Sequence, residues 1–502
     1  MESFGLFSGL VSVLSPVNLL AILAGTMIGL FVGAMPGLSA TMAIAILVPV
    51  TFALPPETGI SMLAAIYISA MYGGSVSAIL IRTPGTASAA ATVMDGYPMA
   101  RQGKAGQALS ISLSASFCGG VISSIALLTV APVLGRIALE FGPVEMAAVA
   151  VLGMTIIASL SQGSTILGLL SGSLGLLLST IGMDPVAGVP RFTLNNINLF
   201  SGIPFTVALI GLFSIPQVLR LLERDEQEHE AGRISDSVRP RWSVIRPLMP
   251  TIGRSSFIGI LVGLIPGTGG DTACWFAYNE AKRFATSEQK KEFGKGIPMG
   301  VAAPEAANNA VVGGALIPTI SLGIPGSSST AVLLGGLMAH GIMPGPTLMT
   351  EYAHVAYTLI WAVMIGNFTM LLLGLGFTRV AVHVTRIPSK VLCTGIVVFC
   401  VIGSFAINNS FFDVYLMLAF GLLGYFMDRL EVPVAPLVIG LILGSMLDKS
   451  IHQSLLISQG SWWIFLQEPI SCGILIISSL SLLNGTPVLG FLSRTLKKAV
   501  GK

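Results

Sequence analysis

Two proline–glycine pairs lie inside long apolar segments of this chain, and each is followed by a short run of hydroxyl side chains. Pro84-Gly85 precedes Thr86 and Ser88, and Pro325-Gly326 precedes a run of three serines and a threonine. Proline removes a helix donor and glycine releases the chain, so each pair predicts a broken helix. The N–H groups of the helix that restarts, together with the hydroxyls, can bind a carboxylate. The alternative is that these small residues only permit close helix packing.

We take the residues around these breaks as candidate anion ligands. Arg82, just before the first break, either attracts an anion, snorkels, or pairs with a backbone carbonyl. The complete set of candidate substrate-binding residues is Ser39, Arg82, Thr83, Gly85, Thr86, Ser88, Gly326, Ser327, Ser328, Ser329 and Thr330.

Asp271 follows the glycine-rich run GLIPGTGG, inside an apolar region. An acid within a membrane is a functional candidate, and here it can bind Na⁺ or carry H⁺. It can also be the N-cap of a helix over 272–280. Glu305 and the Asn308-Asn309 pair either line a pathway or cap a kink. The candidate cation-coupling residues are Gly37, Gly267, Thr268, Gly269, Asp271, Asn308 and Asn309.

The composition is that of an integral membrane protein. Of the 502 residues, 53% are hydrophobic and only 10% are charged, whereas about a quarter are charged in soluble domains. The apolar runs, at about 20 residues each, can cross a bilayer as helices. Histidines and cysteines lack metal-ligand spacing, so we expect no metal site and no cofactor beyond a coupling ion. The sequence has no stripe of basic residues interleaved with aromatic residues, the pattern that would indicate nucleic-acid binding.

Motifs recur in the same order in two halves of the chain. GAMPG at 33–37 reappears as GLIPG at 263–267, and the two Pro-Gly breaks follow in the same order. We therefore expect a first membrane repeat with its N-terminal segment over 1–220 and a cytoplasmic linker over 221–249. A second membrane repeat follows over 250–447, and then a C-terminal loop and final helix over 448–502.

Lys and Arg in short loops predict which loops are cytoplasmic. The region 250–280 lies between such loops but is too short for two crossings, so we expect a re-entrant hairpin. Residues 17–54 form either a matching hairpin or two thin crossings. The predicted fold is all-α, with two inverted-topology repeats, each containing a hairpin and a broken helix, and about 11 full crossings plus two hairpins.

Inverted repeats with broken helices at mid-membrane are typical of secondary transporters. The sequence contains no GxxxxGK[ST] motif, the nucleotide-binding loop of ATP-driven transporters. A channel is one alternative, to be distinguished by passive rather than gradient-coupled flux. An intramembrane hydrolase is another, but it would need a second membrane-embedded Asp facing Asp271, and none is convincing. We expect no enzymatic activity.

At these motifs the sequence resembles the large membrane subunit of the bacterial tripartite tricarboxylate transporter family. The resemblance rests on GAMPGLS (33–39), YGGSVSAILIRTPGTASAAATVMDGYPMARQGKAG (72–106), GLIPGTGG (263–270) and AAPEAANNAVVGGALIPTISLGIPGSSSTAVLLGGL (302–337). It implies symport of a tricarboxylate-like or related organic anion with a cation. It also implies a multi-pass location in the bacterial inner membrane, a small membrane subunit and a periplasmic solute-binding protein.

Overall fold

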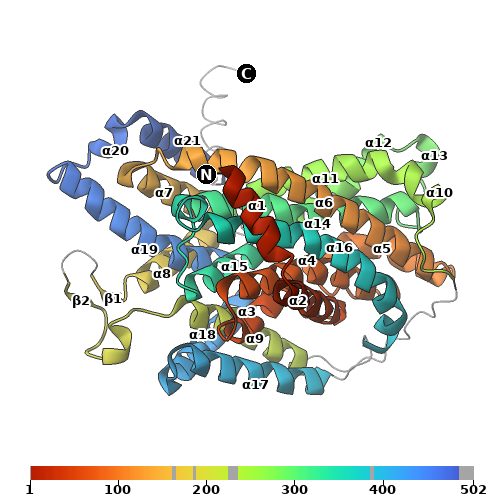
Figure 1. The fold of residues 1–502 in the computed structure, drawn as a ribbon, viewed down its shortest axis with the longest axis horizontal. Helices are drawn as coiled ribbons and strands as arrows, with labels where there is room; N and C mark the ends of the chain where they lie inside the picture. Colours follow the sequence, from red (N-terminus) through yellow and green to blue (C-terminus); the bar gives the residue numbers. More distant parts are fainter. Residues whose placement is uncertain (1, 161–164, 185–187, 224–235, 385–388, 486–502) are drawn as a thin grey trace, which may run out of the picture.

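Apolar helices make up nearly all of the computed structural model, which describes residues 2–160, 165–184, 188–223, 236–384 and 389–485 (Figure 1). Within these ranges, nine helices are long and apolar enough to cross a membrane. The prediction of a helical, multi-pass membrane protein is therefore confirmed.

Within the described residues, the first half begins with α1 (Glu2–Val13) and continues through ten further helical segments and one small hairpin of strands. They are α2 (Pro16–Ala34), α3 (Ala40–Thr51), α4 (Pro56–Ile81), η1 (Ala87–Ala89), α5 (Ala90–Arg101), α6 (Ala105–Ala138), α7 (Pro143–Leu160), α8 (Thr165–Ser179), β1 (Gly182–Met183), β2 (Pro190–Arg191), η2 (Ile197–Leu199) and α9 (Phe205–Glu223). The two strands pair antiparallel.

The second half has only helical elements within its described residues. Its segments are α10 (Trp242–Ile245), η3 (Arg246–Leu248), α11 (Met249–Leu264), α12 (Gly269–Phe284), α13 (Ser287–Lys290), α14 (Pro298–Leu322), α15 (Ser328–Ala339), η4 (Pro346–Met349), α16 (Ala353–Val384), α17 (Ser389–Asn408), α18 (Phe411–Arg429), α19 (Val434–Ile457), α20 (Ile464–Gln467) and α21 (Pro469–Gly485).

The two central helices are α4 and α14, which are buried almost from end to end. Helix α14 packs on α6 and α11, and α4 packs on α2 and α16. Outside this centre, α9 lies against α18 and α17 at the bottom of the view, whereas α19 lies against α8 and α7 at the left (Figure 1). Helices from the two halves therefore alternate across the molecule, and the core is shared between them.

Helices α4 and α14 both end abruptly and restart after a short extended segment. Arg82 (φ 60°) ends α4 and Gly323 (φ 73°) ends α14, both in the left-handed conformation that stops a helix. The segment after α4 then packs against the backbone of α2, because Gly85 lies beside the carbonyl oxygen of Gly33. After α14, Gly326 lies in the same way beside the carbonyl oxygen of Gly263 in α11.

A buried carboxylate anchors α5 to the loop before α14. Asp95 accepts hydrogen bonds on Oδ1 from the N–H groups of Gly294 (2.9 Å), Gly296 (2.8 Å) and Ile297 (3.0 Å). Its Oδ2 accepts one from the Tyr278 hydroxyl at 2.8 Å. This acid of the DGYP motif is thus satisfied by the start of the second central helix.

Part of the polar linker predicted for 221–249 lies outside the described residues, which omit 224–235. Its described end contacts the first half, because Asp236 accepts a hydrogen bond from the N–H of Gln107 at 2.8 Å, in the first turn of α6. The end of the predicted C-terminal segment, 486–502, is likewise outside the described residues.

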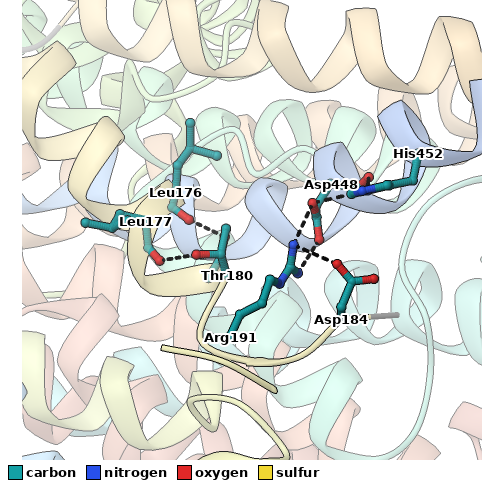
Figure 2. A network of polar contacts seen from close by, with 8 residues as sticks. Leu176, Leu177, Thr180, Asp184, Arg191, Asp448 and His452 are labelled. Carbon is teal, nitrogen blue, oxygen red and sulfur yellow. Dashed lines mark hydrogen bonds and ion pairs between the residues drawn. The ribbon is translucent and has the colours of Figure 1, made fainter. Parts of the chain in front are cut away.

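An ion-pair network ties the small strand hairpin to the later part of α19 (Figure 2). The Arg191 guanidinium lies 2.6 Å from Asp448 and 3.2 Å from Asp184, measured between nitrogen and oxygen. His452, one turn beyond Asp448, is 3.4 Å from the same carboxylate. The loop between α8 and α9 is therefore fixed to the other half of the chain.

The close approach at the first break predicts a large effect of a single methyl group. In Gly85→Ala the new Cβ would lie 1.9 Å from the Gly33 carbonyl oxygen. Overpacking of this kind typically costs about 1–3 kcal/mol or more. We expect a clearly lower melting temperature in detergent. Gly253→Ala in α11 is the control, because its Cβ would meet nothing within 4 Å. Equal melting temperatures for the two variants would contradict the packing described above.

Candidate functional site

The hydroxyl runs that follow the two breaks lie on either side of the turn between α11 and α12. A Cβ built on Gly270 would lie 2.9 Å from the Ser88 Cβ, and one built on Gly269 would lie 3.9 Å from the Ser327 Cβ. Both breaks therefore approach one hairpin tip. The structure brings together Ser88 and Ser327, which are far apart in the sequence.

Hydroxyl pairs join the second break to the first half of the chain. Ser327 caps α15, with the N–H of Thr330 donating to its Oγ at 3.2 Å. The Ser327 hydroxyl also pairs with the Tyr67 hydroxyl of α4 at 3.1 Å. Two residues later, the Ser329 hydroxyl pairs with that of Thr41 in α3 at 2.9 Å. All five side chains are buried.

These groups can donate hydrogen bonds to an anion. When two hydroxyls pair, one hydrogen forms the bond and the other stays free to donate. The first intrahelical bond of α15 runs from the N–H of Ala331 to Ser327, so the N–H groups of Ser328 and Ser329 precede it. A helix N-terminus also attracts negative charge. Ser328 itself is half-buried.

The first break has a similar but smaller set of polar groups. Thr86 and Ser88 are buried, and their hydroxyls lie 3.1 Å apart. The Ser88 hydroxyl is also 3.9 Å from the Met71 sulfur. The N–H of Gly85 donates to the carbonyl of Gly74 at 3.0 Å, which holds the break against α4.

Asp271 lies in the first turn of α12, as its third residue. The alternative that it caps this helix is wrong, because the cap is Thr268. Its side chain is exposed, and within the described residues no other residue donates a hydrogen bond to its carboxylate. It lies within electrostatic range of the Tyr67 hydroxyl and of Cys274. An accessible carboxylate without a partner can bind a cation or a proton.

Asn308 and Asn309 link the two central helices. Their side-chain amides donate to the carbonyls of Met71 (3.2 Å) and Ile68 (3.4 Å) in α4. The Oδ1 atoms of both are buried without a partner within the described residues. The Asn308 Oδ1 would lie 3.0 Å from a Cβ on Gly270. Asn308 therefore borders the hairpin tip, and Asn309 lies one residue further along α14.

Several other candidates make local contacts. Arg82 is exposed, with its guanidinium 5.9 Å from the centroid of the Tyr97 ring. Ser39 accepts a hydrogen bond from the N–H of Met42 at 3.1 Å and so caps α3. The Thr83 hydroxyl is half-buried and turns back toward α4.

The remaining candidates shape the hairpin turns. Gly37 (φ 88°), Gly267 (φ 78°) and Gly269 (φ 62°) have the positive φ that favours glycine. The N–H of Gly267 donates to the carbonyl of Gly326 at 3.0 Å, so the second turn is bonded to the second break. The Thr268 hydroxyl donates to carbonyls of its own turn, including Ile265 at 2.8 Å.

Sequence reasoning missed Thr41 and Tyr67, whose hydroxyls pair with Ser329 and Ser327 at the second break. Each is a single polar residue on an apolar helix, and nothing in its local pattern marks it. Thr41 does follow the first hairpin turn closely, which is the one signal that would have found it. Within the described residues, no group of three or more His, Cys, Asp or Glu could hold a metal ion.

Comparison with known proteins identifies relatives along the whole chain. The model of the tripartite tricarboxylate transporter TctA family matches residues 19–439. An uncharacterized 52.8 kDa protein in the TAR-I ttuC′ 3′ region of Agrobacterium vitis is 37% identical over 471 residues, which is 93% of each chain. An uncharacterized protein in the TAR-II ttuC′ 3′ region of the same organism is 36% identical over 217 residues, which is 43% of this chain and 89% of that protein. No solved structure matches.

The match covers both breaks and both hairpins, and with them the hydroxyl cluster between the two halves. It confirms the resemblance seen in the motifs. The chain belongs to the tripartite tricarboxylate transporter TctA family, whose members are membrane components of transporters.

Proposed function

We propose that this chain is the carrier subunit that takes up a carboxylate, of tricarboxylate or related type, by symport with a cation. The observation that carries the proposal is the meeting of both hydroxyl runs at one hairpin tip, with Ser88 on one side and Ser327 on the other. A carboxylate deep in a membrane protein needs several donors, because losing its hydration is costly. Hydroxyls and helix N–H groups at this point supply them without a fixed positive charge.

The coupling cation, Na⁺ or H⁺, binds at Asp271 in this proposal. The carboxylate is accessible and lacks a hydrogen-bond partner from another residue in the described part of the chain. It lies in the first turn after the tip that separates Ser88 from Ser327. Cation binding there would neutralise a negative charge beside an anionic substrate, so each would favour binding of the other.

An inverted arrangement of the two halves supports alternating access. The contact between Gly85 and Gly33 in one half has its counterpart between Gly326 and Gly263 in the other. Helices α8 and α9 pair with α19 and α18 of the other half. Such paired repeats let one substrate site open in turn to each side of a membrane.

Partners complete the carrier in this proposal. A periplasmic solute-binding protein delivers the carboxylate, and a small membrane subunit joins this chain in the inner membrane. The proposal rests on membership of a tripartite family. Co-expression of the chain with both partners, followed by reconstitution into vesicles, gives the system for testing. Saturable citrate uptake that needs a cation gradient would support the proposal, whereas passive, non-saturating flux would favour a channel.

Single hydroxyl deletions test the anion site. In Ser88→Ala and Ser329→Ala we expect the apparent affinity for the transported carboxylate to fall about 10- to 150-fold, the cost of one hydrogen bond to a charged group. Because both serines would contact one anion, their effects should be non-additive in the double variant. Ser454→Ala, which removes a buried hydroxyl of α19 bonded only to Ser450, is the control. If the apparent affinity for the carboxylate is unchanged in both single variants, the two serines do not bind it.

Removing the charge at Asp271 tests cation coupling. Asp271→Asn keeps the shape of the side chain but removes its negative charge, so concentrative uptake should be lost while the protein stays folded. Glu280→Gln is the matched control, since it removes an acid from the same helix, α12, near its other end. Cation dependence of uptake is the measurement. An Asn variant with the same cation dependence as the parent protein would disprove the assignment.

Cysteine labelling tests the orientation of the two halves. Ala53, in the turn after α3, and Lys290, at the end of α13, are both exposed. The inverted arrangement places them on opposite sides of the membrane, with Lys290 in the cytoplasm. Single cysteines at these positions, in a background without the five native cysteines, should react with an impermeant reagent from opposite sides. Labelling of both from one side would contradict the inversion.

A further inference from the structure

One carboxyl group in the core has no role in the site described above. Glu305 lies on α14 with its side chain fully buried. Hydroxyl groups from two neighbouring helices donate to it: Thr92 of α5 to Oε1, and Ser112 (3.1 Å) and Ser116 (3.0 Å) of α6 to Oε2. Ser75 of α4 contacts it as well and pairs with Ser112 at 2.8 Å. We call these four hydroxyl residues the Glu305 cage.

No positive charge balances this carboxyl within the described residues. The titratable groups that sense its charge are Tyr72 of α4 and Cys274 of α12, which are neutral. On the other packed elements, Asp95 of α5 is bound to the loop before α14, and Arg254 of α11 lies over the Phe284 ring. Asp271 of α12 adds another acid. A buried, unpaired carboxylate is costly, even with hydroxyl donors.

The geometry of the cage fits a carboxyl group that can bind a proton. The hydroxyl oxygens of Ser112 and Ser116 lie at hydrogen-bond distance from one carboxyl oxygen. Each hydroxyl can donate one hydrogen bond and accept two. The cage can therefore donate to a carboxylate and, after rotation of one hydroxyl, accept from a carboxylic acid. Both protonation states are satisfied without moving heavy atoms.

The cage also spans the two halves next to the breaks. Thr92 lies in α5, the helix that follows the first break, and Glu305 lies in α14, the helix that precedes the second. Asn308, one turn after Glu305, borders the hairpin tip between Ser88 and Ser327. A change of charge at Glu305 would alter the attraction between α5 and α14, and so reach the proposed substrate site.

We propose that Glu305 is a proton-binding site of the carrier and that its proton crosses the membrane with the carboxylate. The inference rests on the proposed function. Glu305 takes one proton from water on the outer side to become a carboxylic acid, and it returns that proton to water on the inner side. No other bond forms or breaks. This site is separate from Asp271, so the cation bound there and the proton are two coupled species.

Infrared difference spectroscopy of the purified carrier complex tests the proton site without relying on transport. The wild type should show the C=O band of a buried carboxylic acid that disappears as the pH rises. Glu305→Gln, which keeps the size of the side chain, should lack this band. Glu145→Gln is the control, because Glu145 is also buried but bonds to Gly142 at the start of α7. An identical titrating band in wild type and Glu305→Gln would overturn the inference.

Ser116→Ala gives a second test that keeps the carboxyl group. Removing one donor weakens the carboxylate form, so the band should persist to a pH higher by about one unit, a tenfold change in proton affinity. Ser114→Ala removes a hydroxyl bonded to Ser110, outside the cage, and should cause no shift. Equal midpoints for these two variants would contradict the cage as a proton site.

Uptake measurements separate this inference from the proposed function. In vesicles with an internal pH dye, citrate uptake by the wild type should acidify the interior, and Glu305→Gln should lose that acidification. Citrate uptake without acidification in the wild type would overturn the proton site but leave the carrier function in place. A band that depends on Glu305, with no uptake of citrate or other carboxylates by the wild type, would overturn the carrier function and, with it, transport of this proton.

Discussion

Direct backbone contact between each broken helix and its neighbouring hairpin holds the centre of this protein. Gly85 lies against the carbonyl of Gly33, and Gly326 lies against that of Gly263. Neither contact leaves space for a side chain. The two helices that restart after the breaks are therefore fixed by the hairpins, and their N-terminal hydroxyls are placed by backbone geometry. A motion of either hairpin would carry its broken helix with it, which would link the proposed substrate and cation sites mechanically.

The polar groups of the core follow from this arrangement. Most buried polar groups in proteins have a hydrogen-bond partner, because a buried group without one is costly. Tyr67, Thr41 and the serines of the second break bond to each other in pairs, and Glu305 bonds to the hydroxyls of its cage. These groups lie along the boundary between the two halves. A carrier that moves one half relative to the other must exchange hydrogen bonds at that boundary, and paired hydroxyls can do so at low cost.

Local signals in the sequence were enough to predict a helical, multi-pass membrane protein and the two breaks. Runs of apolar residues give helix positions, and Pro84-Gly85 and Pro325-Gly326 mark the interruptions because proline and glycine act on their own backbone. Partners across the fold could not be predicted in this way. Whether Ser327 meets Tyr67, or Asp95 meets Gly296, depends on how distant segments pack. The local hydrogen bonds of Ser39 and Thr268 likewise depend on how each turn folds. The inverted orientation and the boundaries of the four predicted segments stay predictions from the sequence.

The most direct measurement is an experimental density map of the carrier complex determined with citrate as the probe and compared with a map without it. If the two breaks form one anion site, density for the carboxylate should appear beside Gly269 and Gly270, within hydrogen-bond distance of hydroxyls from both halves, Ser88 on one side and Ser327 or Ser329 on the other. Carboxylate density that contacts residues of only one break, or that lies away from this hairpin tip, would contradict the shared site.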